Sequence, residues 1–436
     1  MDKTCPFRST TIVDQLAPGC GPAPIDLVGG YQGAQLTRGG VYTQTGGNPI
    51  GIKAQAVLLL SLAVFALAFG SGCAARARNK PFELVWPEPP EPPRIKFVRT
   101  LSSELDLKGQ SMAQSAADFV IGRKHDVQHM REPLGLAVSD DGKRLFVSDY
   151  EQLVVYVFDF DTKKVTILGQ ETPLGRPLGL ALDAAQNLYV SDQEGKRILV
   201  FDTAYTPQRV IKLSDVTRPS GIAIDRNRSL LYVADTSTNE SEQHFVKVYD
   251  LDGKFIRNVG KGRGTNEGYL LFPTYVSLDP DGNVYVSDTM NCRISVFDPE
   301  GNFVRKYGDM GDSWGEMNKP KGVALDSFGN LYVVDSAWSV VQIFNKRGDV
   351  LLFFGGRHRL PGMMENPTGV AIDHNNRIYV ADTFNFRVNV YDLVNTTAAD
   401  SLPDIPSADG GAGGKTQNEQ TSSLQFKPLG REIQTP

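Results

Sequence analysis

The chain has 436 residues, of which 41% are hydrophobic and 22% are charged, the ordinary composition of a globular protein. Its 45 basic and 50 acidic residues leave a formal net charge of -5. This balance argues against nucleic acid as the partner, because nucleic-acid-binding surfaces normally carry a basic excess. The cysteines are too far apart for metal-ligand spacing and do not indicate a disulfide scaffold; they are Cys5, Cys20, Cys73 and Cys292.

Residues 1–50 are rich in Gly and Thr and show no periodicity. They precede a segment with the features of an export signal, which normally stands at the start of a chain. Two interpretations remain open: a start codon assigned too early, or a disordered N-terminal extension.

Residues 51–73 have the features of an export signal. Lys53 precedes an apolar run over residues 54–69, and Gly70-Ser71-Gly72-Cys73 follows. The run is short for a membrane span, which needs about 20 apolar residues. Small residues before Cys73 resemble the lipobox of bacterial lipoproteins, although Gly70 stands where that motif prefers Leu. The resemblance implies a lipid anchor on Cys73; an ordinary cleaved signal and an uncleaved anchor are the alternatives.

The residue after the cysteine bears on localisation. Ala74 follows Cys73, and in the bacterial sorting pattern that this segment resembles, a residue other than Asp favours the outer membrane. We therefore expect an exported outer-membrane lipoprotein on the periplasmic or surface side. A soluble periplasmic protein and an inner-membrane-anchored protein are the alternatives.

Residues 74–93 form a linker whose end is dense in proline, from Trp86 to Pro93. Such a sequence favours polyproline II, a stiff spacer of about 3 Å per residue. At the other end of the chain, residues 395–436 contain few large apolar side chains, and we expect a disordered tail.

Residues 94–394 contain six internal repeats, and the repeats predict the fold. Each repeat has an alternating strand that ends in aspartate, as in Leu145-Phe146-Val147-Ser148-Asp149. Successive aspartates are separated by 43, 43, 53, 47 and 47 residues. Because this spacing accommodates about four short strands, each repeat has the size of one propeller blade. The six aspartates are Asp149, Asp192, Asp235, Asp288, Asp335 and Asp382.

A second recurring strand begins with proline two residues before a glycine, as in Pro133-Leu134-Gly135. Proline starts a strand without needing to donate to the ladder, and glycine is small enough for strands that crowd around a propeller axis. The fourth repeat departs from this pattern with Tyr275.

The sixth repeat stops after its third strand, at Val394. Residues 94–99 have the chemistry of the missing fourth strand, and pairing there would close the ring and protect its edges. The sequence therefore predicts an all-β, six-bladed β-propeller with four-stranded antiparallel blades and an N-terminal strand that closes the last blade.

These repeats resemble the NHL repeat family. Residues 288–293 and 382–387 carry the family's Asp-x-x-Asn-x-Arg element in full, with Asn291 and Arg293 in one copy and Asn385 and Arg387 in the other. The other four blades depart from it. Residues 104–131 do not match the repeat, and we expect a short helical excursion there.

Related propellers include enzymes, so the resemblance must be tested against their ligand positions. Gluconolactonase-like propellers bind a divalent metal through Asn and Asp before the innermost-strand glycines, and amidating lyases use histidines. Here the innermost positions hold no carboxylate or amide, and the few histidines do not recur there. We therefore expect no metal and no cofactor. A metal-dependent lactonase or amidating-lyase-like enzyme remains the disfavoured alternative. The innermost positions hold Leu134, Leu178, Ser220, Thr274, Lys321 and Thr368.

The six repeated aspartates are interpreted as structural, because a catalytic residue need not recur in every blade. The arginines of the Asp-x-x-Asn-x-Arg element are expected to brace adjacent blades through these carboxylates. Binding is instead expected on the face that carries the second-to-third loops and the blade-to-blade loops, where aromatic and basic residues collect. The candidates are Tyr150, Lys261, Arg263, Trp314, Trp338, Arg357, His358, Arg359, Phe384 and Phe386.

The functional hypothesis is a non-enzymatic, envelope-tethered and monomeric propeller that binds a protein or peptide partner through this face. Binding of carbohydrate or cell wall through the same aromatic residues is a minor alternative. Eukaryotic NHL proteins that bind RNA are a poor guide, given the export signal and the negative charge.

Overall fold

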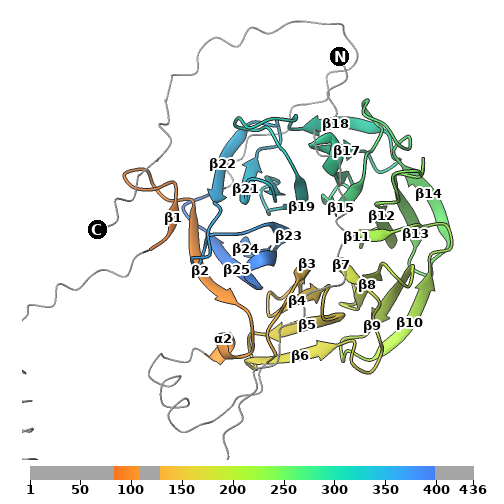
Figure 1. Ribbon diagram of the computed structural model, residues 1–436, viewed down its shortest axis with the longest axis horizontal. Coiled ribbons are helices and arrows are strands. Elements are labelled where there is room, and N and C mark those ends of the chain that lie inside the picture. Colours follow the sequence, from red (N-terminus) through yellow and green to blue (C-terminus); the bar gives the residue numbers. More distant parts are fainter. Residues whose placement is uncertain (1–82, 109–127, 398–436) are drawn as a thin grey trace, which may run out of the picture. The chain divides into compact units, whose positions relative to one another are not determined.

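Six antiparallel sheets follow one another around a common axis in the computed structural model, which describes residues 83–108 and 128–397 (Figure 1). The innermost strands of neighbouring sheets contact each other in chain order, and the last contacts the first. The prediction of an all-β, six-bladed β-propeller is confirmed.

The first three blades are regular four-stranded sheets. Blade one comprises β3 (Pro133–Val138), β4 (Arg144–Asp149), β5 (Val154–Asp159) and β6 (Lys164–Leu168). Blade two comprises β7 (Pro177–Leu182), β8 (Leu188–Asp192), β9 (Arg197–Phe201) and β10 (Pro207–Lys212). Blade three comprises β11 (Pro219–Asp225), β12 (Leu230–Asp235), β13 (Phe245–Asp250) and β14 (Phe255–Val259).

Blades four and five keep the same order from the axis outward. Blade four comprises β15 (Pro273–Leu278), β16 (Val284–Asp288), β17 (Arg293–Phe297) and β18 (Phe303–Tyr307), with a 3-10 turn, η1 (Thr289–Asn291). Blade five comprises β19 (Pro320–Leu325), β20 (Leu331–Asp335), β21 (Val340–Phe344) and β22 (Val350–Gly355).

Blade six joins the two ends of the described chain. Its sheet has the order β1-β2-β25-β24-β23. Ile95 of β2 pairs with Leu393 of β25, and Leu101 pairs with Val388, so the prediction of an N-terminal closing strand is confirmed. The elements are β1 (Val85–Trp86), β2 (Ile95–Leu101), β23 (Pro367–Ile372), β24 (Arg377–Asp382), η2 (Thr383–Asn385) and β25 (Arg387–Leu393).

The short strand β1 corrects the prediction of a stiff spacer at the proline-rich end of the linker. Residues 84–86 fold back along β2 instead of extending away from the propeller. The Trp86 ring packs against Phe354 and Tyr391, with centroid distances of 5.8 and 5.9 Å. Proline density suggested an extended chain, but packing of a large aromatic side chain against blades five and six prevails.

Burial follows the position of each strand within its blade. The second strands are flanked on both faces by neighbouring blades, and all five residues of β16 are buried. Burial on both faces explains why these strands carry small or apolar side chains on both faces up to the serine and aspartate at their ends. The outermost strands alternate between exposed and covered residues, as in β18 and β22, because one face is open to solvent.

Hydroxyl groups connect neighbouring blades close to the axis. Ser148 donates to the Leu178 carbonyl at 2.7 Å, and Ser191 donates to the Ser220 carbonyl at 2.6 Å. Blade three has alanine at the corresponding position, and Thr236, two residues later, donates to the Pro273 carbonyl at 2.8 Å. The blade junctions are thus oriented by hydrogen bonds as well as by apolar packing.

The excursion between β2 and β3 begins with a single helical turn, α2 (Leu105–Lys108). The Asp106 carboxylate accepts from the backbone N–H groups of Ser102 and Ser103 and stabilises the start of the turn. Residues 109–127 lie outside the described residues, as do the 1–50 extension, the signal at 51–73 with Cys73, residues 74–82 of the linker, and all but 395–397 of the tail. Within the described ranges, no helix has the length and apolar character that a membrane crossing needs.

Candidate functional site

One side of the propeller carries both the blade-to-blade loops and the second-to-third loops. In blade one, Pro133 at the start of β3 pairs with Asp149 at the end of β4, so the loop that enters a blade and the loop after its second strand meet. The same pairing recurs in the other blades, for example Pro273 with Asp288. We call this side the loop face.

The six repeated aspartates are fully buried and hold the incoming loops. Asp149 accepts from the backbone N–H groups of Arg131 and Glu132 at 2.6 and 3.2 Å, and also from the N–H of Gln152 at 2.9 Å. A buried carboxylate thereby satisfies backbone donors from two loops. Equivalent bonds are made by Asp192, Asp235, Asp288, Asp335 and Asp382.

The Asp-x-x-Asn-x-Arg element adds side chains to the same arrangement. In blade four, Asn291 and Arg293 donate to Asp288 at 2.8 and 2.9 Å. Arg293 also donates to the carbonyls of Asn266 and Tyr269 in the loop that enters this blade. The arginine therefore fastens the loop that connects blades three and four to its own blade.

Blade six repeats this geometry. Asn385 and Arg387 donate to Asp382, and Arg387 also donates to the carbonyls of Leu360 and Met363.

Blade two contains an arginine of the same kind that the sequence reading missed. Arg197 donates to Asp192 at 2.8 Å and to the Pro173 carbonyl at 2.8 Å. The five-residue separation from the aspartate matches that between Asp288 and Arg293. The Asp-to-Arg spacing alone could have identified Arg197, but Gly195 stands where the Asp-x-x-Asn-x-Arg element has asparagine, so the element was not recognised in blade two.

Burial and charge set the ionisation of these carboxylates. Burial raises the pKa of Asp288 to about 6, although Arg293 and the hydrogen bonds oppose the shift. Since the folded-state pKa lies above the usual value, the folded protein binds more protons than the unfolded chain between about pH 4 and 6.

This shift makes a pH dependence testable. We expect the contribution of Asp288 to the free energy of unfolding to increase by on the order of 3 kcal/mol as the pH falls from 7 to 4. Urea denaturation across this range should show a smaller increase for Asp288→Asn than for the wild type. Parallel pH profiles would contradict the assignment.

The axis is surrounded by the innermost strands, and their glycines allow very close packing. A Cβ atom built on Gly135 would lie 1.8 Å from the Leu178 carbonyl oxygen, and one on Gly369 would lie 2.2 Å from the Leu134 oxygen. Gly179, Gly221 and Gly322 face the next blade in the same way.

Blade four has Tyr275 at the corresponding position. Its hydroxyl lies 3.5 Å from the Leu134 carbonyl oxygen of blade one, opposite in the ring, so the side chain extends across the axis.

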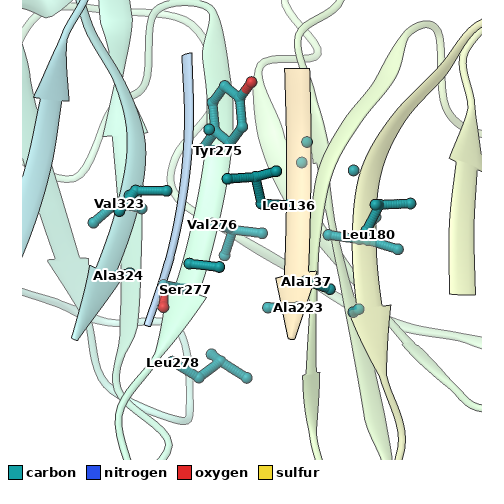
Figure 2. A pocket seen from close by; sticks show the side chains of 18 of the residues that line it. Leu136, Ala137, Leu180, Ala223, Tyr275, Val276, Ser277, Leu278, Val323 and Ala324 are labelled. Atoms are coloured by element: carbon teal, nitrogen blue, oxygen red, sulfur yellow. The ribbon is translucent and has the colours of Figure 1, made fainter. Parts of the chain in front are cut away.

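An axial cavity of about 300 Å³ lies beside Tyr275 and is lined by the innermost strands of all six blades (Figure 2). Figure 2 shows Tyr275 near one end of the cavity and Leu278 near the other, with small and branched apolar side chains between them. Ser277 and the Tyr275 hydroxyl are the polar side-chain groups labelled there. This lining offers no acid–base pair for catalysis.

The other side chains of the innermost strands bear on whether a metal ion could bind near the axis. Lys321 is the charged one among them; burial and then the nearby Lys319 lower its pKa to about 8. Among residues 83–108 and 128–397, no group of three His, Cys, Asp or Glu side chains is arranged to hold a metal ion.

The predicted binding residues divide into two groups. Tyr150 is half-buried between blades one and two, with its hydroxyl 3.1 Å from Gln193 and 3.2 Å from Arg176. Arg263 donates to the Asn239 carbonyl. These side chains are engaged within the fold, whereas most of the others are exposed: Lys261, Trp314, Trp338, Arg357, His358, Arg359, Phe384 and Phe386.

A second cavity, of about 400 Å³, opens among the loops of blade four and was missed by the sequence reading. Met290 and Met310 contribute its thioether side chains, and Lys306, Asp309 and Glu316 contribute charged groups. Thr265 and Leu271 extend its wall from the loop that carries Lys261 and Arg263. These residues come from three separate loops, so no spacing in the sequence predicts the cavity.

Comparison with known proteins agrees with this architecture. A family model described as NHL repeat matches residues 270–297 and 365–391, in blades four and six. Among curated proteins, Protein brain tumor of Drosophila melanogaster is 27% identical over 137 residues, which are 30% of this chain and 12% of that protein. The chain therefore spans only a small part of the length of this relative.

Several solved structures are similar to this chain at low identity. A protein of unknown function from Bacteroides thetaiotaomicron is 17% identical, with a TM-score of 0.49 over 60% of this chain and 70% of that one. A virginiamycin B lyase from Staphylococcus aureus, solved with quinupristin, is 14% identical, with a TM-score of 0.46 over 60% and 95% of the chains. A chain of a nidogen–laminin complex is 19% identical, with a TM-score of 0.44 over 60% and 92%.

Proposed function

We propose that this NHL-repeat, six-bladed propeller is a non-catalytic scaffold, tethered to the cell envelope by a lipid on Cys73, that binds a protein or peptide partner through its loop face. The repeated polar residues support a scaffold role, because their hydrogen bonds are made within the propeller. The alternative of a metal-dependent lactonase or lyase has less support, since the axial cavity is lined mainly by Ala, Leu, Ile and Val.

The observation that most directly supports partner binding is the cavity of about 400 Å³ on blade four. Met290 and Met310 can adapt to an apolar side chain of a partner, because thioether chains are flexible and polarizable. Lys306, Asp309 and Glu316 lie around them and can fix the orientation of an inserted segment. Its volume suits one or two side chains, which is the way a peptide anchors in a protein surface.

Substitution within this cavity tests the proposal. Met290→Glu combined with Met310→Glu places two charges against an apolar anchor, and we expect at least tenfold lower recovery of the partner. The measurement is affinity capture of the full chain from membranes, followed by mass spectrometry. The matched control is Val210→Glu with Val304→Glu, two exposed positions on outer strands.

Equal recovery with the cavity variant and the control, when both are folded by circular dichroism, would contradict a partner site in this cavity. Recovery of polysaccharide in place of protein would favour the carbohydrate-binding alternative.

A further inference from the structure

Large apolar side chains are exposed at the loops and outer strand of blades five and six. Their exposed fractions lie between 39% and 61%. Several large apolar side chains exposed near one another on a folded protein mark a protein or membrane interaction site. We call this set the aromatic patch; its members are Trp314, Trp338, Phe353, Leu360, Phe384 and Phe386.

Aromatic packing and hydrogen bonds place these side chains on neighbouring segments. The rings of Trp314 and Phe353 contact each other with centroids 4.7 Å apart. Arg357 donates to the Ala337 carbonyl at 3.0 Å, beside Trp338.

The loop at 356–366 also contacts blade six. Asn385, between Phe384 and Phe386, donates to the His358 carbonyl at 3.1 Å. This loop therefore joins the part of the patch on blade five to the part on blade six.

The left-handed backbone at Phe386 belongs to a turn that recurs four residues after the repeated aspartates, since Leu153, Lys196, Cys292 and Ser339 also have positive φ. Phe386 has φ +58° and is exposed by 54%. A bulky residue is disfavoured in this left-handed conformation, which suits Gly or Asn. Cys292, at the equivalent position of blade four, has φ +54° and is buried.

Positive charge lies among the apolar side chains of the patch. Arg357 and Arg359 are exposed on the 356–366 loop. The Arg359 side chain is 85% exposed, and its Nε atom lies 3.4 Å from the Glu365 carboxylate. Tryptophan and phenylalanine next to arginine form the combination that binds the interface of anionic bilayers.

The N-terminal chain reaches the propeller at this same loop. The Leu84 side chain lies against Gly362, where a Cβ atom would be 2.6 Å from the Leu84 Cδ2 atom. Phe97 donates to the Leu84 carbonyl at 2.9 Å, which keeps this segment along β2. Cys73 precedes Leu84 by 11 residues, and a chain of that length spans at most about 40 Å. An anchor at Cys73 therefore keeps the aromatic patch within reach of the bilayer.

We propose that the aromatic patch docks on the bilayer surface, with its tryptophan and phenylalanine rings at the lipid interface and Arg357 and Arg359 at anionic headgroups. This inference rests on the tether in the proposed function and adds an orientation to it. The cavity formed by Met290 and Met310 on blade four lies outside the aromatic patch and remains for the partner.

Quenching of tryptophan fluorescence by brominated lipid tests this docking. The chain has three tryptophans, and Trp86 packs against Phe354 of blade five and Tyr391 of blade six. The full chain is bound to vesicles of phosphatidylglycerol and brominated phosphatidylcholine. In the Trp314→Phe variant, the emission of Trp338 should be at least twofold lower on vesicles with brominated lipid than on vesicles without bromine. The double variant Trp314→Phe with Trp338→Phe, which retains only Trp86, should show little quenching.

A binding measurement supplies a second readout. In the unlipidated Cys73→Ser chain, Phe384→Ser with Phe386→Asn should weaken vesicle binding at least tenfold, and asparagine suits the left-handed backbone at 386. Val210→Ser with Val304→Ser, on exposed outer strands, is the control and should leave binding unchanged.

Unquenched Trp338 in vesicle-bound protein would overturn the docking, as would equal binding of the patch variant and the control. A shift of Trp338 emission on addition of the captured partner, without quenching by lipid, would assign the patch to a protein instead. Two separate measurements test the proposed function: partner capture by the Met290/Met310 variant, and the mass of a lipid on Cys73. Failure of the proposed function is therefore distinguishable from failure of this inference.

Discussion

Replacing Gly135 with alanine is expected to lower the free energy of unfolding by about 3 kcal/mol or more. The added Cβ would lie 1.8 Å from the Leu178 carbonyl oxygen, which belongs to the backbone of the next blade. Ser148 binds both strands, accepting from the Gly135 N–H at 2.8 Å and donating to Leu178 at 2.7 Å. Relief of the clash therefore requires movement of one blade relative to the other, and overpacking of this kind is strongly destabilising.

Gly301→Ala is the matched control for this substitution. Gly301 has φ +96°, but a Cβ there would come no closer than 3.4 Å to its nearest neighbour. Only backbone strain opposes this alanine, and we expect a loss of about 1 kcal/mol. Urea denaturation of both variants measures the difference. If the two variants lose equal stability, close packing around the axis does not explain the innermost glycines.

Replacing Asp288 with alanine is expected to lower the free energy of unfolding by about 3–5 kcal/mol. The substitution leaves Arg293, whose side chain is exposed by only 7%, without its carboxylate partner. It also removes the acceptor for the Leu271 N–H, so the loop that enters blade four loses its attachment. Breaking one half of a buried ion pair costs more than the pair contributes, because an uncompensated charge remains buried.

A double-mutant cycle with Arg293 separates these effects. Arg293→Ala in the Asp288→Ala background should restore part of the lost stability, because it removes the buried charge. Asp140→Ala, which breaks an exposed pair with Arg226, should cost less than about 1 kcal/mol. Additive losses in the cycle would mean that the two side chains do not act as a pair.

The ring could be predicted from sequence because its determinants recur. Residues such as Asp149 and Gly135 satisfy the same requirement in successive blades, so spacing alone reveals the number of blades. The closing strand was also predictable, since blade six lacks a fourth strand and residues 94–99 have the right alternation.

The irregular parts of the molecule escaped prediction because their partners are remote in sequence. Trp86 was assigned to a spacer, and its contacts with Phe354 and Tyr391 become visible only once the ring is closed. The cavity formed by Met290 and Met310 depends on how three loops meet in space.

Exposure on the loop face was only partly predictable. Of the aromatic residues predicted there, Tyr150 packs between blades, whereas Trp338, Phe384 and Phe386 are exposed. Residue type indicated that these positions lie in loops, but it could not indicate which rings find a neighbour within the fold.

The pairing of β2 with β25 joins a strand synthesised near the start of the propeller to the strand synthesised last. During synthesis or translocation, β2 leaves first and must wait for almost 300 residues to follow before Leu393 can reach Ile95. Pairing of such distant segments is slow, since the loop-closure entropy has to be overcome before the contacts form. Through that interval, β2 lacks its partner β25, and an unpaired strand edge is an aggregation hazard. Closure of the ring is therefore expected to be a late step in folding, after the blades built from local contacts have formed.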